Sequence, residues 1–123
     1  MHGESIVEKV EAGTNLEAVS SKYVDLLAHP GIFTPDEANT AVKNDVYIEI
    51  TSRKGHGLTN GIVAKVGREA GVRFLINSDA HNHSDLFQSD FQSKVGIGSG
   101  LESDEVENIL SRNSKDFLSK IRY

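Results

Sequence analysis

The sequence predicts an α/β domain in which parallel strands alternate with helices. Three short runs are rich in β-branched and large apolar residues, as is typical of buried strands: 24–28, 46–50 and 73–77. Helical patterns lie between these runs, and the connections are short. Alternating units of this kind form a parallel sheet with right-handed crossovers.

The helical segments carry recognisable start and stop signals. Residues 34–45 begin with Thr34 as N-cap, Pro35 at the first helical position and Glu37 three residues after the cap. Residues 60–71 carry an apolar stripe and stop at their final glycine. Four more helical segments are expected, the last two begun by the serine caps Ser103 and Ser114: 15–23, a short turn near 84–93, 103–113 and 114–123.

Length and composition fit one globular domain that spans residues 1–123. Hydrophobic residues make up 37% of the chain and charged residues 25%, and no apolar run is long enough to cross a membrane. There is no cysteine and no signal-peptide pattern, so the cytoplasm is the expected location. The net charge of −5 argues against a broad nucleic-acid surface, although it leaves room for an anionic substrate beside bound metal ions.

Polar groups follow each of the three predicted strands. His29 follows the first strand, residues 51–56 follow the second, and residues 78–81 follow the third. The carboxyl ends of parallel strands lie at one edge of the sheet, where ligands of such folds bind. The sequence therefore predicts a functional site at this edge.

Asp79 and His81 are the sharpest feature at this edge. Residues two apart in an extended segment point to the same side, so one carboxylate and one imidazole could hold one metal ion or two adjacent ions. The simpler interpretation is that Asp79 caps a turn and His81 lies on the surface. For His29, the choice is between a metal ligand and a hydrogen-bonded structural histidine.

Residues that follow the second strand fit a phosphate group. Arg53 and Lys54 could bind phosphate or could lie in a solvated loop, while His56 could be a ligand, a proton donor or merely exposed. The glycine-rich segment 96–100 lacks the other residues of a phosphate-binding loop, so a flexible connector is expected there. The chain has no cysteine nucleophile and no Gly-x-Ser-x-Gly motif, so metal-assisted hydrolysis fits better than a covalent mechanism.

Taken in order, "HGE", "LAHPG", "IEITSRKGH", "TNG" and "NSDAH" followed by "DL" resemble the PHP (polymerase and histidinol phosphatase) superfamily, in particular its histidinol-phosphatase-like members. The similarity covers residues 2–87. It implies a distorted β/α barrel that holds several divalent metal ions (Zn, Mn or Fe) and hydrolyses phosphoesters.

Carried over position by position, the resemblance implies four metal ligands: His2, His29, Asp79 and His81. It implies catalytic roles for Arg53 and His56, and substrate binding by Arg53 and Lys54.

The resemblance stops short of a whole barrel. The His-x-His motif of the family's first strand is absent, as are its later histidines and its bridging glutamate, so the chain matches only the C-terminal half of a PHP barrel. The strand that should deliver His2 is expected to be missing. Half a barrel leaves strand edges unpaired, and apolar side chains are expected to lack cover: Leu26, Ile48 and Leu75 or Ile76.

The sequence therefore predicts association with a separate N-terminal half-barrel chain or with a second copy, unless the chain is a fragment of a longer protein. Its leading functional interpretation is a metal-dependent phosphoesterase, acting on a phosphorylated small molecule, that needs the barrel to be completed. A non-catalytic half-barrel scaffold or subunit is the alternative. A nucleic-acid-processing accessory role comes third.

Overall fold

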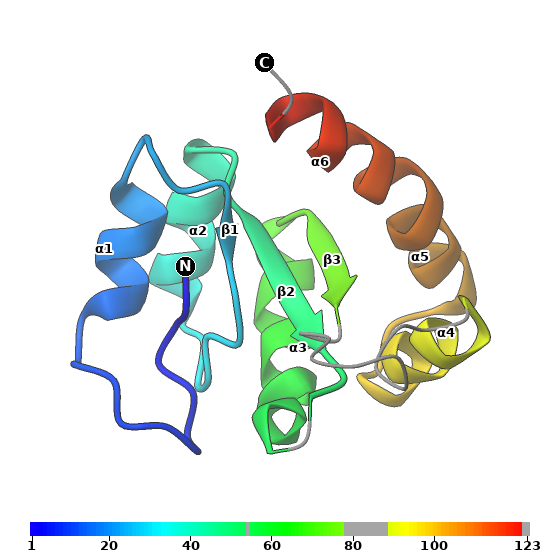
Figure 1. The fold of residues 1–123 in the computed structure, drawn as a ribbon, viewed down its shortest axis with the longest axis horizontal. Helices are drawn as coiled ribbons and strands as arrows, with labels where there is room; N and C mark the ends of the chain where they lie inside the picture. The colour runs from blue at the N-terminus through cyan, green and yellow to red at the C-terminus, as the bar shows by residue number, and fades with distance from the viewer. Residues whose placement is uncertain (54, 78–88, 122–123) are drawn as a thin grey trace.

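The computed structural model describes residues 1–53, 55–77 and 89–121 (Figure 1). Helices alternate with the strands of a parallel sheet, which confirms the predicted α/β class. In chain order the elements are α1 (Thr14–Ser20), β1 (Leu26–Leu27), α2 (Pro35–Lys43), β2 (Tyr47–Thr51), the 3₁₀ turn η1 (His56–Thr59), α3 (Asn60–Ala70), β3 (Phe74–Asn77), α4 (Ser89–Gly98), α5 (Ser103–Asn108), the π-helix η3 (Ile109–Asn113) and α6 (Ser114–Ile121).

The sheet of the described residues has the order β1-β2-β3, with all neighbours parallel. Leu27 pairs with Ile48, and Ile48 in turn pairs with Phe74. Helices α1, α2 and α3 lie along one side of the sheet, and α4, α5 and α6 curve past β3 (Figure 1). The arrows of β2 and β3 point the same way, so the segments that follow the strands emerge at one edge of the sheet.

Two predicted helix signals are confirmed. Thr34 and Glu37 form a reciprocal capping box at the start of α2, in which the Thr34 hydroxyl accepts from the Glu37 amide at 3.2 Å. Gly71 ends α3 in the left-handed conformation, with φ 85°. In the described ranges, no helix combines the length and the apolar character needed to cross a bilayer.

The two predicted serine caps are wrong. The residue that caps α5 is Glu102, whose backbone amide donates to Glu105 Oε1 at 2.9 Å. Ser114 has helical backbone angles, because α5, η3 and α6 follow one another without a break. The residue pattern alone does not show which of two neighbouring polar residues takes the cap position.

The expected flexible connector at 96–100 is also wrong for its first part, since Gly96 and Gly98 belong to the last turn of α4. A β-carbon on Gly96 would lie 2.7 Å from Val106 Cγ2 and 2.9 Å from Ile76 Cδ1. This glycine therefore serves packing, because it lets α4 lie close to α5 and β3.

The expectation of uncovered apolar side chains is wrong for three of the four residues named. Ile48, Leu75 and Ile76 are 0%, 6% and 4% exposed, and only Leu26 is partly exposed. Ile48 and Ile76 belong to the main hydrophobic core, on the face of the sheet that the helices cover. The predicted association would therefore rest on unpaired strand edges and not on uncovered apolar side chains.

The outer edge of β3 is already occupied by side-chain amides. The carbonyl of Arg73 points toward β2, where it accepts from the Ile48 amide. The carbonyls of the alternate residues point outward, and Phe74 O accepts from Asn113 Nδ2 at 3.1 Å, while Ile76 O accepts from Gln92 Nε2 at 3.2 Å. The C-terminal helices thus supply donors to both outward carbonyls of an edge that was expected to be unpaired.

The Asn113→Ala substitution is expected to lower the free energy of unfolding by about 1–3 kcal/mol, because it leaves the buried Phe74 carbonyl without a donor. Ser111→Ala, at an exposed position of the same π-helix, is the matched control and should change stability by no more than about 0.5 kcal/mol. Urea unfolding measures both. Equal midpoints for the two variants would show that the amide does not stabilise the edge.

Candidate functional site

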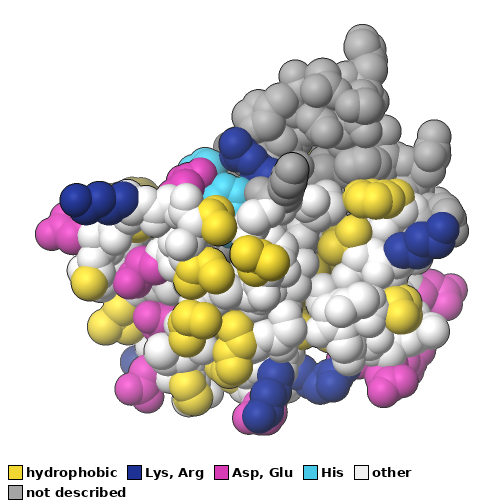
Figure 2. All heavy atoms as spheres, turned by 90° about the horizontal axis from the view of Figure 1, so that it is seen from below, with side chains coloured by type: hydrophobic (Ala, Val, Ile, Leu, Met, Phe, Trp, Pro, Cys, Tyr) yellow, Lys and Arg dark blue, Asp and Glu magenta, His cyan; other side chains and the backbone are white. Residues whose placement is uncertain are grey.

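Three histidines from distant parts of the sequence meet at the carboxyl edge of the sheet. His2 Nδ1 lies 2.9 Å from His29 Nε2, and the two rings meet edge to face at 4.7 Å between centroids. The ring of His56 stacks on that of His29, with centroids 4.0 Å apart and an interplanar angle of 19°. Figure 2 looks at this edge and shows histidine side chains beside acidic and basic ones.

The strand β1 and a buried carboxylate place His29. His29 follows the strand by two residues and is 2% exposed. Its φ of 32° is unusual for a residue other than glycine, and such strained backbones concentrate at functional sites. The backbone amide of His29 donates to Glu49 Oε1 at 3.0 Å, which holds the unusual conformation in place.

Glu49 is a site residue that the sequence analysis did not identify. It lies in the middle of β2 and is 4% exposed. The available signal was a carboxylate inside an otherwise apolar strand, since glutamate is rarely buried without a partner.

A short stretch of extended chain places His2; it makes one isolated bridge, and no strand of the described residues includes His2, as expected. His2 forms a parallel bridge with Ala28, in which the Ala28 amide donates to Met1 O and the Gly3 amide donates to Ala28 O, both at 2.8 Å. Residues 1–3 therefore extend the sheet beyond β1. The side chain of His2 is exposed while that of His29 is buried, so the pair opens to solvent on the His2 side.

The glycines of the "HGE" and "HPG" motifs let these two segments pack backbone to backbone. A β-carbon on Gly31 would lie 2.0 Å from Glu4 O, and one on Gly3 would lie 2.8 Å from Pro30 Cα and 2.9 Å from Ala28 O. No side chain fits at either position. Both motifs therefore need glycine so that the two histidines can approach each other.

Asn15 joins the same two segments and was also not identified from the sequence. It is 1% exposed and accepts from the Glu4 amide at 2.9 Å. Its amide group donates to Pro30 O at 2.7 Å and to Glu37 Oε1 at 3.2 Å. One side chain in α1 thus holds the residues that follow His2 and His29.

His56 is buried, which excludes the exposed alternative for this residue. It is 3% exposed, and both of its ring nitrogens have partners: Nδ1 lies 2.6 Å from Ser5 Oγ, and Nε2 lies 3.0 Å from Glu8 Oε1. The sequence analysis did not identify Ser5 or Glu8, which lie in an irregular segment.

The pKa of His29 is lowered, first by burial and then by the neighbouring His56 and His2. A lowered pKa favours the neutral ring, which carries a lone pair on one nitrogen. Neutral imidazole is the form that binds metal ions. In the described part of the chain, the Nδ1 atom of His29 is buried and has no hydrogen-bond partner.

Arg53 lies between β2 and η1, the 3₁₀ turn that begins at His56. Its side chain is partly exposed, and its backbone amide donates to Thr51 Oγ1 at 3.0 Å. Lys54, Asp79 and His81 fall outside the described residues. Their predicted roles stay predictions, and so do those of His2, His29, Arg53 and His56.

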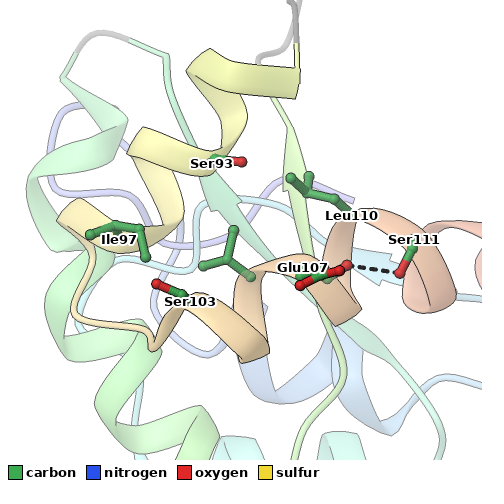
Figure 3. A pocket seen from close by; sticks show the side chains of 7 residues that line it. Ser93, Ile97, Ser103, Glu107, Leu110 and Ser111 are labelled. Atoms are coloured by element: carbon green, nitrogen blue, oxygen red, sulfur yellow. Dashed lines mark hydrogen bonds between the residues drawn. The ribbon is translucent and has the colours of Figure 1, made fainter.

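A cluster of three or more metal-binding side chains is not found within residues 1–53, 55–77 and 89–121. Within these residues, the candidate metal-binding side chains are the imidazoles of His2 and His29, since both ring nitrogens of His56 have other partners. A groove of about 440 Å³ between α4 and α5 is lined by three serines, Glu107 and apolar side chains (Figure 3). Its lining includes no histidine, lysine or arginine, so the groove does not extend the histidine cluster.

Comparison with known proteins gives relatives of about twice the length of this chain. An uncharacterized protein of Methanocaldococcus jannaschii is 47% identical over 121 residues, which cover 98% of this chain and 56% of the relative. Probable phosphatases of Caldanaerobacter subterraneus and Thermoanaerobacter pseudethanolicus are 34% and 30% identical over 128 and 116 residues. These matches cover 94% and 85% of this chain, and 50% and 47% of the relatives. No family model matches the chain.

Proposed function

We propose that this chain is the C-terminal half of a PHP-type β/α barrel and acts in metal-dependent hydrolysis of phosphoesters on small molecules. The observation that carries the proposal is the contact between the His2 and His29 rings at the carboxyl edge of a parallel sheet. The names of the two probable phosphatases support the reaction class. The chain's coverage of about half of each relative supports the half-barrel.

The described residues fit a divalent cation in part. Two ring nitrogens face each other at 2.9 Å, and a cation that accepted a lone pair from each would take the place of the contact between the rings. Asp79 and His81, in the proposal, complete the donor set. A bound Zn, Mn or Fe ion would supply Lewis acidity toward the phosphate and would make a bound water more acidic.

The chain's own residues would orient the substrate and balance its charge. Arg53 would donate hydrogen bonds to the phosphate oxygens, with Lys54 beside it as a second cation. Glu49 would support the site from inside the protein, because it accepts a hydrogen bond from the backbone amide of His29. Its buried position makes it a supporting group and keeps it from the substrate.

The remaining half of the barrel would join the sheet at residues 1–3. In the described part of the chain, no strand pairs beyond these residues, whereas both outward carbonyls of β3 already have amide partners. An N-terminal half-barrel, in the same polypeptide or in a separate chain, or a second copy, would bring the ligands that this chain lacks.

Metal binding and hydrolysis test the proposal separately. Isothermal titration calorimetry should show Zn²⁺ or Mn²⁺ binding that weakens at least about tenfold in His2→Asn and in His29→Asn. Asparagine is chosen because it tolerates the left-handed backbone at position 29. Glu107→Gln, an exposed position on α5, should bind as the wild type does.

With metal bound, Arg53→Ala should keep its metal affinity and lose roughly a hundredfold or more in hydrolysis of para-nitrophenyl phosphate. Unchanged metal affinity in both histidine variants would contradict the proposed site. Metal binding without hydrolysis, even after the other half of the barrel is added, would favour the non-catalytic subunit.

A further inference from the structure

The ring of His56 makes three contacts, two with the segment that follows His2 and one with His29. Its nitrogens bond to Ser5 and Glu8, and its face stacks on His29. Ser5 and Glu8 belong to the segment that follows His2. Within residues 1–13 the only pairing with the sheet is the bridge at His2, so this segment depends on side-chain contacts for its position.

The partners of His56 determine the positions of its protons. A carboxylate can only accept, so the bond to Glu8 places a proton on Nε2. When the ring carries this one proton, Nδ1 is the acceptor and the Ser5 hydroxyl donates to it. The Ser5 oxygen also lies 3.4 Å from the Val7 amide, which donates to it. Ser5 and both ring nitrogens are therefore fully engaged inside the protein.

The burial of His56 and Ser5 argues against direct contact between the His56 ring and a substrate. His56 is 3% exposed and Ser5 is 5% exposed, whereas Glu8 is 41% exposed and reaches the ring from the solvent side. A general acid needs a ring nitrogen that can approach the leaving group. Here each nitrogen faces a protein partner, and the ring face lies against His29.

We propose that His56 is a positioning residue. Through Ser5 and Glu8 it holds the His2 segment against the loop after β2, and through its stacked ring it sets the orientation of His29. This inference rests on the proposed function only in so far as the His2–His29 pair is a metal site. The geometry of the pair itself does not depend on that function.

The test removes the partners of His56 and leaves all three histidines in place. Ser5→Ala/Glu8→Ala deletes both hydrogen bonds, and Glu8→Gln keeps an oxygen that can accept from Nε2. Glu11→Ala is the matched control, because Glu11 is an exposed carboxylate of the same segment. Zn²⁺ affinity is measured by calorimetry. In the metal-free protein, the nuclear Overhauser contact between the rings of His2 and His29 and the tautomer of His56 are measured by NMR.

We expect the wild type to show the Nε2–H tautomer of His56. The double variant should lose 10- to 100-fold in Zn²⁺ affinity, as changes to groups that orient metal ligands do, and should lose the ring contact. Glu8→Gln and Glu11→Ala should stay within about threefold of the wild-type affinity.

Wild-type behaviour of the double variant in both measurements overturns the inference, as does an Nδ1–H tautomer. If the double variant fails to fold, Glu8→Ala compared with Glu8→Gln decides the question at an exposed position. A wild-type chain that binds no metal defeats the proposed function, while the ring contact and the tautomer still decide the role of His56.

Discussion

Gly31→Ala is expected to lower the free energy of unfolding by roughly 2–5 kcal/mol, the largest stability effect of any substitution considered. Two costs combine at this position. The backbone has φ 71°, which an alanine resists, and the added methyl would lie 2.0 Å from Glu4 O. The chain can relieve this contact only by moving the "HGE" segment away from the "HPG" turn. The His2–His29 contact should then be lost together with stability.

Gly71→Ala is the control that separates the cost of a positive φ from the cost of the steric contact. Gly71 has φ 85°, and a β-carbon there meets nothing within 4 Å, so only the backbone cost of about 1 kcal/mol remains. Urea unfolding followed by circular dichroism measures both variants, and the same samples give Zn²⁺ affinity. Equal destabilisation by the two substitutions would mean that the close approach of the two segments does not constrain the fold.

Asn15→Asp is expected to cost about 2–4 kcal/mol although it barely changes the shape of the side chain. The amide group of Asn15 donates to Pro30 O and to Glu37 Oε1. An oxygen in its place would face two acceptors in a position that is 1% exposed, so both bonds become repulsive contacts. Because Pro30 follows His29 directly, the metal affinity should fall as well.

Asn108→Asp provides the control for this substitution. Asn108 is exposed at the end of α5, and the same chemical change there should stay within about 0.5 kcal/mol. Denaturant midpoints compare the two variants directly. If Asn15→Asp were as stable as the control, the hydrogen bonds of Asn15 would not join the two segments, and the arrangement of the site would need another cause.

The sequence predicts the parts of this fold that depend on neighbours along the chain. Thr34 and Glu37 cap α2 as expected, and Gly71 stops α3, because each signal acts within one turn of helix. Ser103 shows the limit of such reasoning, since Glu102 caps α5 in its place. Gly96 shows a second limit, because its need for space arises from Val106 and Ile76, which are distant in sequence.

Some residues of the candidate site can likewise be predicted from the sequence, and others cannot. A rule about strand ends is enough to place His29 and the segment around His56 at one edge, and the structure brings them together. Glu49 and Asn15 escape that rule, because their importance lies in buried bonds to segments 20 and 15 residues away. Buried polar groups of this kind are identified by their partners, and only the folded chain supplies those.

The amides of Asn113 and Gln92 also limit how copies of this chain can assemble. A sheet with two free margins can add neighbours without end, which is the route to fibrils. With the Phe74 and Ile76 carbonyls bonded to these amides, a strand that pairs at this margin of the described residues would first have to displace them.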